Sequence, residues 1–210
     1  MRRTREEALE TRDRILDCAE LAFFAQGVAE TSLLDIASAA GVTRGAIYGH
    51  FTNKTEVFNA VVARVKLPMD ALFEAANHPA AADPIAMLRD ALSACMRDMA
   101  ADARTARVFS ILLTHRDGAA DWLRESQRQS NLEGRERIAD ALRNAVRRKQ
   151  LPADLEIARA AALLMAALVG VLHDWLIAPG ALSLPDEAER IADALLDMLR
   201  LSPALRKKAG

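Results

Sequence analysis

One short stretch, Gly41 to Phe51 (GVTRGAIYGHF), concentrates polar chemistry near the start of the chain. Gly45 and Gly49 stand within a helical pattern there, although an interior glycine costs a helix about 1 kcal/mol relative to alanine. Glycines at such positions leave backbone uncovered, so a partner can approach closely. The groups beside them can hydrogen-bond to phosphates or to base edges. They are the side chains of Thr43, Arg44, Tyr48 and His50.

Two short helices are predicted, one on each side of Gly41, over residues 32–40 and 43–51. Ser32 and the acidic residue three positions later form an N-terminal capping pattern for the first helix. Thr43 is a capping residue type at the start of the second. Two helices of this length joined by a glycine turn are typical of a helix-turn-helix, in which the second helix enters the major groove of DNA.

The second of these helices is predicted to have one buried face and one bare face. Ile47 and Phe51 fall on one side of a helical wheel, and Gly45 and Gly49 fall on the opposite side. The bare side suits close approach to DNA. Helix pairs of this kind are also common structural units, so a helical protein-interaction module that does not bind DNA remains an alternative.

Helical periodicity continues along the rest of the chain and no segment alternates as a strand does, so the fold class is predicted to be all-α. A first helix is expected to end near Gln26, where Gly27 can form a left-handed cap. Asn53 is expected to cap a fourth helix that runs through Val65. A fifth helix is expected to begin at Asp83 and Pro84, and a sixth to cover residues 105–115. Residues 118–150 are expected to form one long or two short helices. An apolar helix is expected to begin at Asp154, and a last helix to cover residues 185–200.

Composition favours a soluble, cytoplasmic globular protein with no membrane partner. Apolar residues make up 51% of the chain and charged residues 27%, and the apolar run over residues 160–176 is closely bounded by charges and is expected to be too short for a membrane span. The net charge of -1 gives no overall basic signature of nucleic-acid binding. A DNA-binding interpretation therefore depends on where the charges are placed, not on their sum. Cys18 and Cys95 match no metal-ligand spacing and are expected to be small apolar side chains.

No catalytic residue, cofactor or metal site is predicted, and we expect that the protein is not an enzyme. The sequence contains no Gly-rich phosphate loop, nucleophile elbow or His-Glu-x-x-His pattern. His173 and Asp174 are adjacent but lack a third metal ligand at helical spacing. Trp122 and Trp175 are expected to be packing anchors.

The segment TSLLDIASAAGVTRGAIYGHFTNKTEVF, residues 31–58, resembles the DNA-binding signature of the TetR family of transcriptional regulators. Within that family the chain is most similar to the AcrR/TtgR-like repressors of multidrug efflux pumps, and DPIAMLRDAL and ARVFSILLTHR resemble their ligand-binding domain. The resemblance implies a two-domain repressor that acts as a homodimer on palindromic operator DNA. Residues 1–53 would form the helix-turn-helix DNA-binding domain, and residues 54–210 the ligand-binding and dimerisation domain.

The resemblance also implies where DNA is contacted: at the start of the second helix, along the third, and at the start of the fourth. These positions are Thr31, Ser32, Thr43, Arg44, Tyr48, His50 and Lys54, with close backbone approach at Gly45 and Gly49. The chain departs from the family pattern twice, because relatives usually carry a bulky aromatic residue at the position of Gly49 and many carry Lys at that of Thr52. Both departures remove expected phosphate contacts. Arg2, Arg3 and Arg5 form either a basic arm that compensates for them or, as is more common for a short charged terminus, a solvated tail.

A hydrophobic small-molecule inducer is expected to bind in the larger domain. Three of its helices offer more Leu, Met and Ala than aromatic residues, which suits an adaptable cavity. The expected lining residues are Met96, Met99, Ser110, Thr114, Met165 and Val169. Core packing explains the apolar members of this set equally well, so that interpretation stays open.

Dimerisation is expected through the apolar helix around residues 158–175 and the helix over residues 185–200. A soluble monomer would not expose so much apolar surface, and small residues allow close helix approach. These small residues are Ala161, Ala162, Ala166 and Gly170. A regulator of the same fold that serves another pathway, such as lipid metabolism, remains a second alternative.

Overall fold

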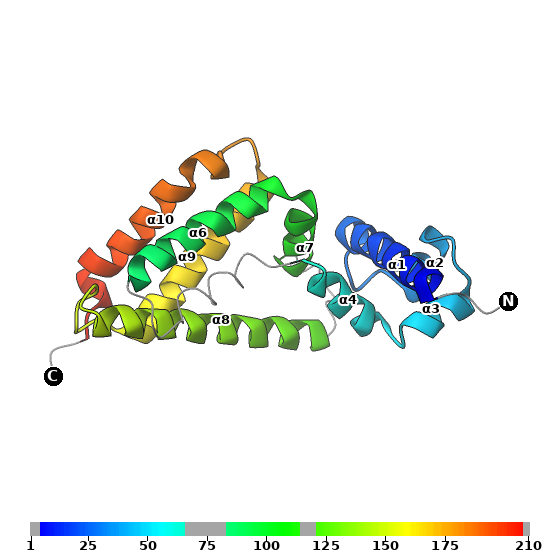
Figure 1. Cartoon of the computed structure of the whole chain (residues 1–210), viewed down its shortest axis with the longest axis horizontal. Helices are drawn as coiled ribbons and strands as arrows, with labels where there is room; N and C mark the ends of the chain where they lie inside the picture. Colours follow the sequence, from blue (N-terminus) through cyan, green and yellow to red (C-terminus); the bar gives the residue numbers. More distant parts are fainter. Residues whose placement is uncertain (1–4, 66–82, 114–120, 208–210) are drawn as a thin grey trace. The chain divides into compact units, whose positions relative to one another are not determined.

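The fold is given by a computed structural model that describes residues 5–65, 83–113 and 121–207 (Figure 1). These residues form α-helices and one 3-10 helix, and their only strand-like pairing is an isolated bridge between Leu155 and Arg206. The prediction of an all-α fold is confirmed. The helices are α1 (Arg5–Gln26), α2 (Leu33–Ala39), α3 (Arg44–His50), α4 (Lys54–Ala63), α6 (Pro84–Ala101), α7 (Ala103–Leu113), α8 (Asp121–Arg147), α9 (Ile157–Ile177), α10 (Leu184–Leu201) and the 3-10 helix Pro203–Leu205.

Packing divides the chain into two compact units. The first unit contains α1 to α4, α7 and the start of α8 up to Arg124, and the second contains α6, the rest of α8, α9 and α10. α7 therefore packs with the N-terminal helices, although it lies between two helices of the second unit in the sequence. The boundary expected after residue 53, between the DNA-binding and the ligand-binding domain, concerns function rather than packing and stays a prediction.

Local capping rules account for the helix ends in the first unit. α1 ends at Gln26, and Gly27 has a φ of +88°, the left-handed conformation predicted for its cap. The side chain of Asn53 caps α4 by accepting a hydrogen bond from the Glu56 amide at 2.9 Å. α4 ends at Ala63, slightly earlier than its apolar pattern predicted.

The core of the first unit is built from apolar side chains of α1, α3 and α4. Phe23 and Ile47 are at most 1% exposed, and the ring centroids of Phe23 and Phe58 lie 6.3 Å apart. The ring of Trp122 meets Phe58 edge-on, with centroids 5.3 Å apart. The packing role predicted for Trp122 is confirmed.

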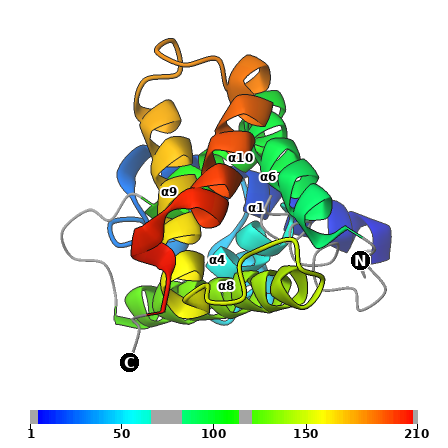
Figure 2. The ribbon, with the colours of Figure 1, turned by 90° about the vertical axis from the view of Figure 1, so that its left-hand side faces the viewer.

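In the second unit α6 packs along α10, and α9 lies beside both (Figure 2). The polar region over residues 118–150, expected as one long or two short helices, forms a single helix of 27 residues within its described part. Ile138 and Leu142 on the apolar side of α8 are buried. The second unit therefore has its own core, separate from that of the first.

The apolar helix begins later than expected. α9 starts at Ile157, and its N-cap is Glu156, whose side chain accepts a hydrogen bond from the Arg159 amide at 3.0 Å. Asp154 does not open the helix, because its carbonyl accepts a hydrogen bond at 2.8 Å from the amide of Lys207 in the C-terminal tail. Pairing with the C-terminal tail therefore decides where α9 begins, and the local sequence pattern gives no sign of that pairing.

Among the described residues, α9 is long and apolar enough to cross a membrane by length and composition alone. It has 21 residues, with a mean hydropathy of 1.9 over its most apolar stretch. α9 is longer than the apolar run over residues 160–176, and a core helix of a soluble protein can have the same length and composition, so these two properties do not decide whether it crosses a membrane. Only 33% of that stretch is buried inside the chain, so much of the apolar surface of α9 faces outward.

Candidate nucleic-acid interface

The starts of α2 and α3 are held by the predicted caps. The Ser32 hydroxyl accepts from the Asp35 amide at 3.1 Å, and the Asp35 carboxylate accepts from the Ser32 amide at 2.9 Å. These hydrogen bonds hold the pKa of Asp35 below its usual value. Thr43 caps α3 by accepting from the Ala46 amide at 3.2 Å. Both helix starts are confirmed as predicted.

The inner face of α3 is anchored in the core. Ile47 is fully buried and Phe51 is 1% exposed, as the helical wheel predicted. The guanidinium of Arg12 lies 5.2 Å from the centre of the Phe51 ring. Arg14 donates from Nε to the Ala40 carbonyl at 3.0 Å, which satisfies an orphan acceptor at the end of α2. α3 is therefore held rigidly although it has only 7 residues.

The outer face of α3 is open. A Cβ atom added at Gly49 would meet no atom within 4 Å, and one added at Gly45 would meet only the Thr43 hydroxyl at 4.0 Å. The bare face predicted from the two glycines is therefore present in the folded chain. Nothing in the domain itself requires this uncovered backbone, so it is available to a partner.

Polar groups surround this open face. Thr43 and Arg44 are exposed, and Tyr48 is 46% exposed. The Arg44 guanidinium lies 5.7 Å from the centre of the Tyr48 ring, a cation–π contact that orders the arginine without covering it. His50 is half-buried beside Phe51. A cation and hydroxyl groups therefore stand next to uncovered backbone, an arrangement suited to a phosphate backbone and base edges.

Two of the expected DNA contacts are placed differently from the others. Thr31 is 1% exposed, and its hydroxyl donates to the Gly27 carbonyl at 2.7 Å, so its side chain points into the domain rather than toward a partner. Lys54 is half-buried and donates from Nζ to the Ala29 carbonyl at 2.8 Å, and burial lowers its pKa. An ammonium group has three donors, so Lys54 keeps donors for a further partner, whereas the Thr31 hydroxyl is buried inside the domain.

The sequence interpretation missed a cluster of charges on the inner side of α1. The Glu20 carboxylate, whose side chain is 3% exposed, accepts from Arg107 at 2.7 Å and from Arg104 at 3.0 Å. Asp17 pairs with Arg104 at 2.7 Å and with Arg64 at 2.8 Å. One signal was available, since Glu20 falls between Leu16 and Phe23 on the buried stripe of α1, where a charge needs partners.

The residues expected to line a ligand cavity are mostly core residues. Met96 and Met99 are fully buried, and Met165 is 3% exposed. These three and the half-buried Val169 belong to the second unit, whereas Ser110 lies on α7 in the first, and Thr114 lies outside the described residues. The second unit therefore contains four of the six, and their burial fits core packing and a cavity wall equally well.

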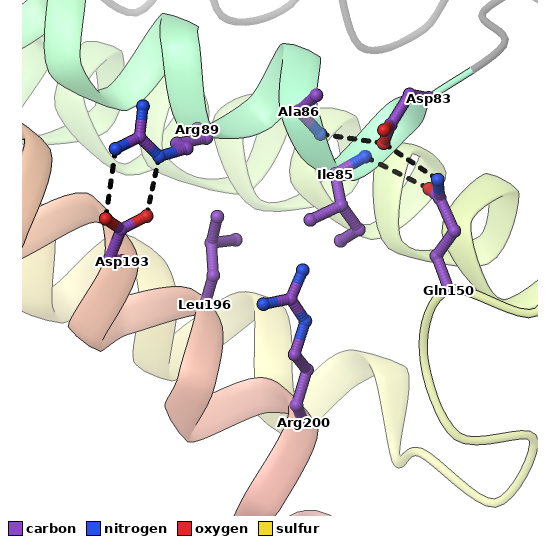
Figure 3. A pocket seen from close by; sticks show the side chains of 8 residues that line it. All are labelled: Asp83, Ile85, Ala86, Arg89, Gln150, Asp193, Leu196 and Arg200. Carbon is purple, nitrogen blue, oxygen red and sulfur yellow. Dashed lines mark hydrogen bonds and ion pairs between the residues drawn. The ribbon is translucent and has the colours of Figure 1, made fainter.

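A pocket of about 370 Å³ lies elsewhere in the second unit, between α6, α10 and the turn after α8 (Figure 3). Arg89 forms a two-pronged ion pair with Asp193, at 2.6 and 3.0 Å. Asp83 accepts from the Ala86 amide at 2.9 Å and from Gln150 at 2.7 Å. None of the six expected ligand residues lines this pocket, and its charged rim does not suit the hydrophobic inducer that was expected.

The chain matches known transcriptional regulators over nearly its whole length. The family of bacterial regulatory proteins called tetR matches residues 15–61, and the C-terminal region of MAATS-type transcriptional repressors matches residues 83–201. The HTH-type transcriptional regulator TtgR of Pseudomonas putida is 43% identical over 209 residues, which cover 99% of this chain and 100% of that protein.

Two solved structures of similar proteins extend the comparison to the fold. The complex of SmeT, a repressor from Stenotrophomonas maltophilia, with triclosan has a TM-score of 0.82 at 31% identity and covers 96% of this chain and 99% of that one. NalD, the secondary repressor of the MexAB-OprM multidrug efflux pump in Pseudomonas aeruginosa, has a TM-score of 0.78 at 30% identity and covers 94% and 100%. By its helix-turn-helix, its fold and these matches, the chain belongs to the TetR family of bacterial transcriptional regulators.

Proposed function

We propose that this protein is a cytoplasmic, ligand-responsive transcriptional repressor that binds a palindromic operator as a homodimer and controls a multidrug efflux operon. The open outer face of α3 carries this proposal, because the uncovered backbone at Gly45 and Gly49 directly follows the exposed Arg44 and Tyr48 in the sequence. Family membership supports the DNA-binding role. The efflux assignment is supported by SmeT and NalD, which are repressors of multidrug efflux pumps.

The proposed DNA contacts divide by chemistry. In this proposal Arg44 reads a base edge in the major groove, while Tyr48 and Lys54 position the domain on phosphates. Thr31 is left out because its hydroxyl is buried and bonded to Gly27. The remaining proposed contacts are Ser32, Thr43 and His50, with close backbone approach at Gly45 and Gly49.

The outward face of α9 supports the homodimer. Leu163 is 44% exposed and Ile177 is 69% exposed, and both lie on the same helical face as the exposed Ala166 and Gly170. Exposed apolar faces of this kind mark interaction sites, and a two-fold axis would cover the face with its own copy. The dimer would then present two recognition helices about 34–36 Å apart, or farther by whole turns of DNA.

The proposed inducer is a hydrophobic small molecule that binds in the second unit near Met96, Met99, Met165 and Val169. SmeT supports this part, because its structure is a complex with triclosan, a small hydrophobic compound. An inducer releases DNA only if it prefers the arrangement that does not bind DNA, and typical coupling of about 1–3 kcal/mol makes release graded rather than complete.

The test is binding of the purified protein to the DNA upstream of its own gene, measured by fluorescence anisotropy at several salt concentrations. Affinity should fall steeply as salt rises, because phosphate contacts release counterions. Calorimetry with triclosan, lipophilic cations and flavonoids, with and without that DNA, should find a ligand that binds the free protein more tightly. Salt-independent binding, or no binding, would favour the interaction-module alternative, and DNA binding that no member of the panel weakens would favour a regulator of another pathway.

A further inference from the structure

Asp17, Glu20, Arg64, Arg104 and Arg107 form a cluster of ion pairs that joins three helices of the first unit. The two carboxylates belong to α1, Arg64 is the C-cap of α4, and Arg104 and Arg107 belong to α7. Each carboxylate contacts two guanidinium groups at 2.7–3.0 Å. Arg104 contacts both carboxylates, so the five groups form one connected network.

The chain connects this cluster to both proposed binding regions. α6 ends at Ala101 and α7 begins at Ala103, so a shift at the end of α6 reaches Arg104 through very few residues. Met99, a proposed ligand residue, lies in the last turn of α6. At the other side, Arg64 caps the helix that begins with Lys54, a proposed phosphate contact.

Burial of Glu20 restricts how the cluster can rearrange. The Glu20 side chain is 3% exposed, and both of its oxygens are occupied, one by Arg107 and one by Arg104. A buried carboxylate that loses its partner bears a large desolvation penalty, so α7 cannot slide gradually away from α1. It either keeps these ion pairs or moves to another arrangement in which Glu20 is again satisfied.

One atom of the cluster points to such a second arrangement. Nη1 of Arg64 is buried and has no hydrogen-bond partner. Among the side chains that the structure describes, it is the one buried nitrogen or oxygen atom that lacks a partner. Buried donors are almost always satisfied in native proteins, so an orphan here needs an explanation. In this cluster three guanidinium groups contact two carboxylates, and a rearrangement of the ion pairs would give Nη1 an acceptor.

We propose that Glu20 and Asp17 are positioning residues for induction, and that their ion pairs transmit inducer binding from the end of α6 to the DNA-binding helices. The inference rests on the proposed function, because it concerns how ligand binding reaches α3. In the arrangement described above, the cluster fixes α1 and the end of α4 to α7. A ligand that moves the end of α6 shifts the cluster to its alternative pairing and thereby changes the placement of α3.

The experiment compares wild type with Glu20→Gln and Arg107→Gln in the full-length protein. Fluorescence anisotropy gives the operator Kd without and with saturating triclosan, and the ratio of the two values measures coupling. We expect a wild-type ratio of about 5–150-fold and a ratio within about twofold of one in both variants. Triclosan affinity of the free variants, measured by calorimetry, should match wild type, because neither residue is among the proposed ligand contacts.

Two further variants keep the result interpretable. Glu136→Gln removes an exposed carboxylate that pairs with Arg143 at 2.8 Å in the second unit, and it should keep the wild-type ratio. Asp17→Asn removes a carboxylate that is 48% exposed, so it carries the test if circular dichroism shows that Glu20→Gln does not fold. Folded cluster variants that bind triclosan and retain the wild-type ratio overturn the inference alone. A ratio of one in wild type that binds both its operator and triclosan overturns the ligand-response part of the proposed function, and the inference with it.

Discussion

Two helices of this protein leave backbone uncovered, and their surroundings suit different partners. At Gly49 of α3 and at Gly170 of α9, an added side chain would meet no atom within 4 Å. The first glycine follows the exposed Tyr48 on a helix that also carries the exposed cation Arg44, whereas the second shares its helix face with the exposed apolar residues Leu163 and Ile177. Charge and apolar surface select different partners, so the same backbone feature suits a polyanion in α3 and a second copy of the chain in α9.

The largest expected effect comes from charging the apolar face. Gly170→Arg places a cation where the free chain has open space, so the fold should keep its thermal stability. In the dimer the same cation would be buried without a partner, which should raise the dimer dissociation constant by at least about 100-fold. Analytical ultracentrifugation at micromolar concentration measures this. Unchanged dimerisation would show that this face of α9 is not the interface.

A second substitution removes the cation beside the polar face. Arg44→Ala should weaken operator binding by about 1–3 kcal/mol if the guanidinium reads a base, and it should weaken binding to scrambled DNA less. Anisotropy with both DNAs measures the difference. Arg190→Ala is the matched control, because Arg190 is 82% exposed and lies on α10 in the second unit. Equal losses in the two variants would contradict a specific role for α3.

A smaller effect is expected from the helix cap that supports α3. Ser32→Ala removes the acceptor for the Asp35 amide and should reduce the free energy of unfolding by about 1 kcal/mol. Urea denaturation measures the loss. Ser183→Ala is a useful control, because Ser183 occupies the N-cap of α10 without a side-chain capping hydrogen bond. A loss in the control as large as that in Ser32→Ala would mean that the capping box does not stabilise α2.

Local rules explain which parts of the fold could be predicted. The capping box at Ser32, the left-handed Gly27 and the division of α3 into buried and bare faces depend on residues within a few positions of one another. These features followed from the sequence because they need no knowledge of tertiary structure. The bare face of α3 could be recognised for a related reason. Its glycines lower helix stability, which breaks the local rule that helix interiors avoid glycine, and close approach of a partner explains the exception.

Long-range contacts account for what could not be predicted. Glu20 pairs with Arg107, which lies 87 positions away in the sequence. Asp154 does not begin α9, because its carbonyl accepts a hydrogen bond from the amide of Lys207 in the tail. Thr31 matches the family pattern, yet its hydroxyl satisfies the carbonyl of Gly27 inside the domain. Met99 shows a different difficulty, because a buried thioether suits a core and a ligand cavity equally well, so neither its type nor its burial separates the two roles.

The most direct test of the central claim uses the empty space at Gly49. Gly49→Lys and Gly49→Glu add side chains of opposite charge at a position where an added Cβ meets no atom within 4 Å in the free domain, so thermal melts of the two variants should agree closely. If the outer face of α3 lies on DNA, the lysine variant should bind the operator at least about tenfold more tightly than the glutamate variant at low salt, and the difference should shrink as salt rises. Equal operator affinity of the two variants would contradict the claim that α3 presents this face to DNA.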